Sequence, residues 1–231
     1  MEAPTRSALR NKPRSREQLK RALETKVLSK IAGLSTIYAV ASLIPISAFL
    51  GGAGFITLGI VIVPVIAYLL RPKAAFVSGL VGSLVVYALQ IGVGPVYGLV
   101  SLLIPTLAAM FGSTGFHSKT GVMLPWGYVL FGGLFYFYTS AGTLLWLLPY
   151  LLVLVSLPLA LLGGRWQVLV LCLYTTMCEL VTMTLASITI LQLPGSLWAL
   201  ITPLMFYERG FATVGSFLVI TGLRKAMPKI E

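Results

Sequence analysis

Three ionisable side chains lie deep inside the apolar part of this sequence, and they are the residues best able to do chemistry there. Glu208 and Arg209 are adjacent within "PLMFYERGFATVG" (203–215), and Glu179 lies in the preceding apolar segment. A charged side chain at bilayer depth costs about 2.5–3.5 kcal/mol on insertion scales, so a chain that keeps one has a partner, a cavity or a function for it. Two interpretations follow: an ion pair that fixes the register of two helices, or a direct role with a ligand or a proton.

Position along the chain predicts which of these charges pair. The turn "QLPGS" is centred at Pro194; Glu179 lies fifteen residues before it and Arg209 fifteen residues after it. In an antiparallel helical hairpin the two are at equal depth, and we expect them to face one another. Glu208 is left over, and it is either protonated, hydrogen-bonded to another helix or exposed to a polar cavity. Hydroxyl groups for the remaining hydrogen bonds are available on Thr175, Thr176 and Thr182.

The composition predicts an all-α integral membrane protein. Apolar residues make up 58% of the 231 residues and charged residues only 10%, far below the roughly 25% of soluble domains. Apolar segments of roughly 17–25 residues cross about 30 Å of hydrocarbon as helices. We therefore predict a bundle of about eight transmembrane helices, within a range of six to eight. The predicted spans are residues 31–50, 54–70, 74–91, 95–112, 122–139, 143–162, 166–191 and 197–223.

The distribution of basic residues predicts the orientation of this bundle. Nine of the seventeen Lys and Arg residues lie in residues 1–30, and alternate connections between the predicted helices hold Arg71, Lys73, Lys119 and Arg165. The other connections hold no charge, and connections rich in Lys and Arg are the cytoplasmic ones. We expect both termini to be cytoplasmic, in a multi-pass protein of the plasma membrane. The predicted parts are a basic tail at 1–30, a transmembrane domain at 31–223 and a short basic tail at 224–231.

The residue inventory argues against catalysis and against nucleic-acid binding. The only histidine is His117, the sequence holds no aspartate, and it has no Gly-x4-Gly-Lys-Ser/Thr phosphate loop. Zinc hydrolases, aspartyl proteases and nucleotide hydrolases need those groups, so we expect no enzymatic activity, no metal and no cofactor. The formal charge of +11 is explained by cytoplasmic Lys and Arg, so no nucleic-acid partner is expected.

Two features are typical of contacts with lipid or with other proteins. Residues 15–30 are predicted to form a basic amphipathic helix, which suits either anionic lipid headgroups or a docking partner. Small residues four positions apart let helices approach closely in a membrane, as at Ser35 and Ala39 in the first predicted span. Such a pair serves either packing within the chain or contact with a partner subunit.

The uncharged side of the predicted bundle is rich in groups able to hold a polar aromatic ligand. Apolar walls with a few amide and hydroxyl groups are typical of small-ligand sites. The alternative is an aromatic belt at the membrane surface, although glutamines fit such a belt less well. The candidate substrate-binding residues are Gln90, Tyr97, Tyr136, Tyr138, Trp146, Gln192 and Trp198.

Two stretches resemble the substrate-binding S components of energy-coupling-factor (ECF) vitamin transporters. They are "ITLGIVIVPVIAYLLRPKAAFVSGLVGSLV" (56–85) and "PLMFYERGFATVGSFLVITGLRK" (203–225). The resemblance implies a small membrane protein that captures a vitamin or related micronutrient outside the cell. Two cytosolic ATPases and a transmembrane coupling subunit would drive its passage inward. The resemblance also implies a loop over the substrate pocket, here "PISAFLGGAGF" (45–55), and a contact of Ser35 and Ala39 with the coupling subunit.

Two classes of function therefore remain open. One is a solute-binding transporter component, and the other is a non-catalytic structural or assembly subunit of a larger membrane complex. A binder has a ligand cavity lined from several helices, whereas a scaffold is packed solid there and exposes faces of small residues to its partners.

Overall fold

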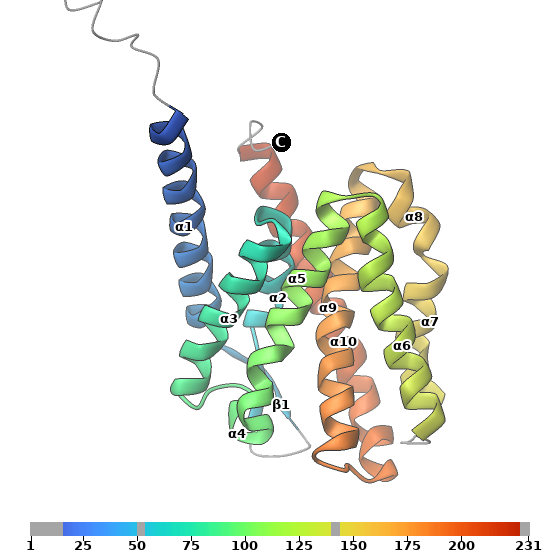
Figure 1. Cartoon of the computed structure of the whole chain (residues 1–231). Coiled ribbons are helices and arrows are strands. Elements are labelled where there is room, and N and C mark those ends of the chain that lie inside the picture. Colours follow the sequence, from blue (N-terminus) through green and yellow to red (C-terminus); the bar gives the residue numbers. More distant parts are fainter. Residues whose placement is uncertain (1–15, 50–53, 140–143, 227–231) are drawn as a thin grey trace, which may run out of the picture.

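The computed structural model describes residues 16–49, 54–139 and 144–226, and these form a bundle of helices with one short β-hairpin (Figure 1). Short 3₁₀ segments precede three of the helices. The α-helices are α1 (Arg16–Ala41), α2 (Gly59–Leu69), α3 (Pro72–Ala88), α4 (Gly94–Tyr97), α5 (Leu103–His117), α6 (Met123–Thr139), α7 (Leu148–Val155), α8 (Leu157–Leu162), α9 (Gly164–Thr189) and α10 (Gly195–Ala226). The remaining elements are β1 (Pro45–Phe49), β2 (Gly54–Thr57), η2 (Gly98–Leu102), η3 (Thr120–Val122) and η4 (Leu144–Leu147).

Several of these helices are suited to a membrane. Within the described ranges, four helical stretches are long and apolar enough to cross one. α10 is longer still, at 32 residues, and carries Glu208 and Arg209 near its middle. α2 and α3 are shorter, at 11 and 17 residues. The helical bundle is thus confirmed, while about eight spans stays a prediction. The four stretches are Gly94–His117, Thr120–Thr139, Leu144–Leu162 and Gly164–Thr189.

The prediction of an all-α fold is wrong in one region, where an antiparallel hairpin replaces parts of two predicted helices. α1 ends at Ala41, so the span predicted for 31–50 stops early, and β2 occupies the start of the span predicted for 54–70. The two strands pair antiparallel with a bulge near the start of β1. Pro45 lacks the N–H group that a continuing helix needs, and the β-branched and aromatic residues that follow favour a strand.

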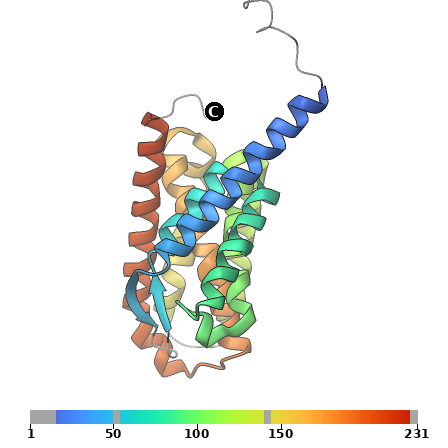
Figure 2. The ribbon, with the colours of Figure 1, turned by 90° about the vertical axis from the view of Figure 1, so that its left-hand side faces the viewer.

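α1 is one continuous helix that passes from the predicted tail into the predicted membrane domain. Residues 24–30 are all exposed, and Figure 2 shows the first turns of α1 leaning away from the bundle. No secondary-structure boundary therefore coincides with the predicted division after residue 30. Residues 1–15, the connections at 50–53 and 140–143, and the end of the C-terminal tail at 227–231 lie outside the described residues.

The connections sort by charge between the two ends of the bundle (Figure 1). Those after α2 and α5 hold Arg71 and Lys119, and Arg165 lies in the first turn of α9, directly after the connection from α8. These connections lie at the same end as the start of α1 and the end of α10. We call this the basic end. The hairpin, α4 and the turn between α9 and α10 lie toward the opposite end, which we call the uncharged end.

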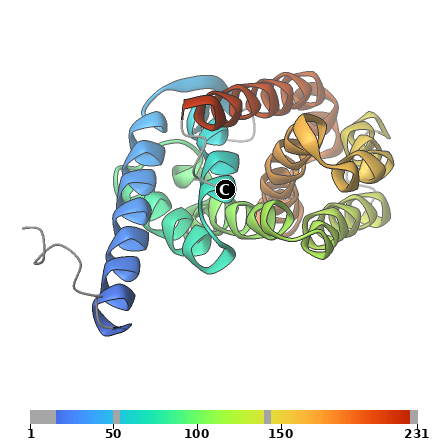
Figure 3. The same ribbon diagram turned by 90° about the horizontal axis from the view of Figure 1, so that it is seen from above.

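α9 is the central helix of the bundle. Each residue from Tyr174 to Thr184 is buried, and the helix contacts α5, α6, α8 and α10 (Figure 3). A helix surrounded on all sides can hold polar groups without exposing them to lipid. Glu179 lies at the middle of this buried run, so its carboxylate is shielded by protein.

Glycine allows α6 to pack closely on α9. A Cβ atom added at Gly132 would lie 2.6 Å from both Cγ atoms of Val181, whereas one added at Gly127 would have nothing within 4 Å. Both glycines belong to α6, so they form a matched pair of positions, one facing α9 and one facing open space.

We expect Gly132→Ala to destabilise the protein and Gly127→Ala to leave it unchanged or slightly more stable. The methyl group at position 132 must displace Val181, and overpacking of this kind costs about 1–3 kcal/mol. Alanine at position 127 brings only its higher helix propensity, about 1 kcal/mol. Thermal unfolding of both variants in detergent measures the difference, and equal midpoints would contradict the close packing of α6 on α9.

Candidate functional site

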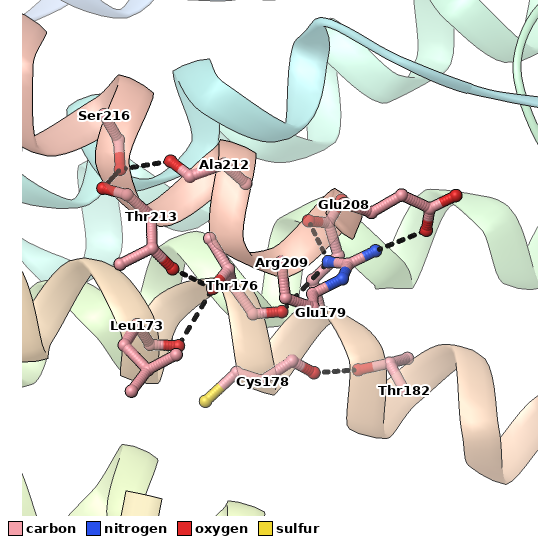
Figure 4. Close-up of polar contacts among 10 residues, drawn as sticks. All are labelled: Leu173, Thr176, Cys178, Glu179, Thr182, Glu208, Arg209, Ala212, Thr213 and Ser216. Atoms are coloured by element: carbon pink, nitrogen blue, oxygen red, sulfur yellow. Dashed lines mark hydrogen bonds and ion pairs between the residues drawn. The ribbon is translucent and has the colours of Figure 1, made fainter. Parts of the chain in front are cut away.

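A buried guanidinium lies between two carboxylates where α10 contacts α9 (Figure 4). Nη1 of Arg209 donates a hydrogen bond of 3.2 Å to Oε2 of Glu179 and one of 3.1 Å to the backbone carbonyl of Thr176. Arg209 is only 2% exposed and Glu179 only 4%. The pairing predicted from equal depth is confirmed, because the two residues project from facing helices at the same level.

The third charge, Glu208, is held by the hairpin. Ser47 of β1 donates a hydrogen bond from its Oγ to Oε1 of Glu208. The other carboxylate oxygen, Oε2, lies 3.9 Å from Nη2 of Arg209, which makes an ion pair but is too long for a hydrogen bond. Of the alternatives left open for Glu208, the structure shows two: a hydrogen bond, with a strand rather than a helix as the donor, and a place in the wall of a small cavity. The charged cluster therefore joins β1, α9 and α10.

One edge of the Arg209 guanidinium has no hydrogen-bond partner in the part of the chain that the structure describes. The unpartnered groups are Nε and Nη2. Of the three threonines predicted to complete the hydrogen bonding, Thr176 contributes its backbone carbonyl, while the hydroxyls of Thr175 and Thr182 donate to carbonyls one turn earlier in α9. A buried donor without an acceptor is costly, so this edge favours an acceptor supplied from elsewhere.

A small cavity adjoins the charged cluster on the side of the uncharged end. Glu208 and Arg209 line one part of it, Trp146 and Trp198 line another, and the hairpin closes a third side through Ala48. The space that water can enter is about 40 Å³, enough for one or two water molecules. We call this space the charged cavity.

Two helix faces supply most of the lining of the charged cavity. On each helix the lining residues recur three or four positions apart, so they share one face. The α10 face runs from the charged cluster toward the uncharged end. The α9 residues are Leu180, Met183, Thr184 and Ser187, and the α10 residues are Trp198, Ile201, Leu204, Met205, Glu208 and Arg209.

Aromatic rings form the part of the wall nearest the uncharged end. The ring centroids of Trp146 and Trp198 are 4.8 Å apart at an interplanar angle of 77°, and Tyr136 packs edge-on against Trp198 at 5.3 Å. The hydroxyls of Tyr97 and Ser187 are 2.6 Å apart. Four of the predicted substrate-binding residues thus gather at one place: Tyr97, Trp146 and Trp198 line the cavity, and Tyr136 packs behind the tryptophans.

The structure does not bring the other three predicted substrate-binding residues to this cavity, so they do not form one site with the four. Gln90 and Gln192 are exposed and adopt left-handed φ angles of 54° and 49° just after α3 and α9. A left-handed residue commonly ends a helix, usually as glycine; here glutamine does so. Tyr138 is 79% exposed at the end of α6.

Ser35 and Ala39 occupy the contact between α1 and α3 of the same chain. Ser35 is 3% exposed, and its Oγ donates to the backbone carbonyl of Ser78 at 2.9 Å. Gly82 lies beside it, since a Cβ added there would be 3.2 Å from the carbonyl oxygen of Ser35. Ala39 is half-buried and borders an apolar groove on the outside of this contact. Ser35 therefore packs within the chain, one of the two alternatives left open, and it also borders the groove, so contact of this face with a partner stays a prediction.

A second small cavity lies beyond the ion pair. It also holds about 40 Å³, and Glu179 and Ser83 line it. The two cavities have Ile56 of the hairpin and Met183 of α9 as common wall residues. The charged cluster therefore borders both cavities, with Arg209 lining the first and Glu179 the second.

Sequence reasoning missed several residues of this site. Helical spacing indicates Thr184 and Ser187, because they lie on the same face of α9 as Leu180, one and two turns nearer to the uncharged end. Met205 follows in the same way on α10, one turn before Glu208. Ser47 carries no such local signal, since it meets Glu208 across 161 residues of sequence.

Comparisons of the chain with protein-family profiles, characterised proteins and solved structures find no match.

We expect exchange of the paired charges to test the charged cluster. Glu179→Arg places two guanidinium groups face to face, and Arg209→Glu gathers three carboxylates, so each single change should cost about 3–5 kcal/mol of folding stability. The double exchange restores opposite charges and should recover much of that loss. Thermal unfolding in detergent measures it, with Glu24→Arg on the exposed part of α1 as the control. A double variant no more stable than either single one would refute the pairing.

Proposed function

We propose that this chain is a membrane-embedded solute-binding protein, the substrate-capture subunit of an ECF-type micronutrient importer. The observation that carries the proposal is the charged cavity, in which Trp146 and Trp198 face a space bordered by Glu208 and Arg209. Small-ligand sites combine apolar and aromatic walls with a few polar groups that fix orientation. A helix bundle that served only as a scaffold has no need to keep a buried charged group without its hydrogen bonds beside aromatic walls.

The location of the cavity fits capture from outside the cell. Its tryptophans lie near the uncharged end, whereas Arg71, Lys119 and Arg165 lie at the basic end. By the positive-inside rule the basic end is cytoplasmic. The cavity then lies on the outer side of the charged cluster, nearer to solutes outside the cell. Both termini lie in the cytoplasm, and the protein belongs to the plasma membrane.

Energy for uptake would come from partner proteins, since the sequence carries no phosphate-binding loop of its own. The resemblance of 56–85 and 203–225 to ECF S components supplies the kind of partner: a transmembrane coupling subunit and two cytosolic ATPases. The exposed basic turns of α1, from Glu24 to Lys30, project at the end where such ATPases would lie.

A second candidate is a structural or assembly subunit of a membrane complex. It is favoured by the open apolar groove between α1 and α3, bordered by Ala32, Thr36, Ala39, Val81 and Val85. Small side chains on one wall of a groove admit a neighbouring transmembrane helix. The same groove suits a coupling subunit, so what separates the two candidates is the presence of a bound solute.

Native mass spectrometry of the gently purified protein tests solute capture. We expect a small molecule to remain bound to the natural chain and to be reduced several-fold in Trp146→Phe, because the smaller ring leaves part of the ligand without a wall. The matched control is Trp166→Phe, since Trp166 is 61% exposed on α9 at the basic end. A chain that retains no small molecule and instead carries protein partners would contradict the capture function and support the assembly subunit.

A further inference from the structure

We infer that the charged cavity binds a neutral, flat ligand with a hydrogen-bond acceptor and a hydrogen-bond donor side by side on one edge, such as a lactam or a carboxamide on a ring. This inference rests on the proposed function, because it names the chemical class of the captured solute. It follows from the hydrogen bonds that the charged cluster leaves unmade and from the cluster's net charge.

The first requirement is an acceptor for Arg209. Its Nε and Nη2 groups have no hydrogen-bond partner among the described residues, although the side chain is only 3% exposed. Both nitrogens are themselves fully buried, so an acceptor reaches them only when the wall of the charged cavity moves. These two nitrogens adjoin on one edge of the guanidinium, with their N–H bonds directed the same way. An incoming oxygen, or an oxygen beside a ring nitrogen, satisfies this edge.

The second requirement concerns charge. Two carboxylates, Glu179 and Glu208, surround one guanidinium, so the ionised cluster carries a net charge of −1. An anionic ligand that reached Arg209 would make the net charge of the site −2 inside the bundle. Burying further unpaired charge at this depth is strongly unfavourable, so the cavity disfavours a carboxylate or phosphate ligand.

A cationic ligand fails for a different reason. It would pair with Glu208, but it would bring no acceptor to Nε and Nη2 and would meet the positive charge of Arg209 at that edge. The buried donors would remain unsatisfied. Net charge alone therefore does not make this a cation site.

A neutral amide edge meets both requirements. Its carbonyl accepts from the free edge of Arg209, and its N–H donates to Oε2 of Glu208, which lies 3.9 Å from Nη2 and makes no hydrogen bond in the described chain. The flat body of the ligand then packs against Trp146 and Trp198, whose rings favour aromatic partners.

Entry of even a single ring requires the cavity to widen. The charged cavity holds about 40 Å³, whereas an apolar cavity that binds benzene holds about 150 Å³. Its wall toward the second cavity includes Ile56 and Met183. Methionine is unbranched and repacks readily, and Ile56 belongs to a two-stranded hairpin rather than to a long helix. Displacement of these two side chains would join the two cavities into one.

Three probes of equal ring size separate the charge classes: benzamide is neutral with the required edge, benzoate is an anion and benzamidine is a cation at pH 7. Each is added at millimolar concentration to the full-length protein in detergent, and the shift of the unfolding midpoint is measured, since a ligand that binds the folded state stabilises it. We expect benzamide to give the largest shift. A larger shift with benzoate or benzamidine would overturn the inference.

The variant Glu208→Gln sharpens the test. It removes the charged acceptor, so benzamide affinity should fall about tenfold, as expected for the loss of a hydrogen bond to a charged group. It also neutralises the cluster, so benzoate affinity should rise. The matched control is Glu24→Gln on the exposed part of α1, which should change neither. Equal weakening of benzamide and benzoate in Glu208→Gln would indicate a structural role for Glu208 and would contradict the inference.

The failure of this inference is distinguishable from failure of the proposed function. If none of the three probes shifts the midpoint while native mass spectrometry still shows a retained small molecule, the ligand class is wrong and solute capture stands. If no small molecule is retained, the capture function itself fails.

Discussion

One buried guanidinium held between two carboxylates is the interaction on which the rest of this structure depends. Arg209 bonds to Glu179 of α9, lies beside Glu208 of its own helix, and is tied through Glu208 to Ser47 of β1. All three charged side chains are buried, so each one depends on its partners in the cluster to offset the loss of solvation. A cluster of three charges is stable only in one geometry. The ion pair of Glu179 and Arg209 therefore sets the register of α9 against α10, and the hydrogen bond of Ser47 to Glu208 sets the position of the hairpin beside α10.

The site follows from that register. With α9 and α10 aligned at Glu179 and Arg209, the residues nearer to the uncharged end on the facing sides of the two helices also lie opposite one another. On α9 these are Met183 and Ser187, one and two turns beyond Glu179. On α10 they are Met205 and Trp198, one and three turns before Arg209, and together with Trp146 they enclose the charged cavity. The burial of α9 by its neighbours keeps this polar interior away from lipid. A structural ion pair is thus compatible with the proposed ligand site, because Arg209 of the pair also lines the charged cavity.

The extent to which sequence predicts this arrangement depends on the range of each interaction. The pairing of Glu179 with Arg209 follows from counting residues around Pro194, because a helical hairpin has a regular rise. The hairpin at 45–57 does not follow from hydropathy, since "PISAF" and "GFIT" are as apolar as a transmembrane helix. Gln90 and Gln192 looked like ligand-binding amides but end helices with left-handed backbones. Ser47 meets Glu208 only through the tertiary fold, so no local pattern indicates it.

The most direct test of this account is an experimental structure of the protein, isolated with native lipid, at a resolution that places individual water molecules. Our central claim is that the Nε and Nη2 edge of Arg209 is directed at an acceptor that the chain itself does not supply. The account predicts density from a small molecule or an ordered water within hydrogen-bond distance of both nitrogens, between Trp146, Trp198 and Glu208. Protein side chains packed against that edge, with both nitrogens bonded within the chain and no remaining space beside the tryptophans, would contradict it.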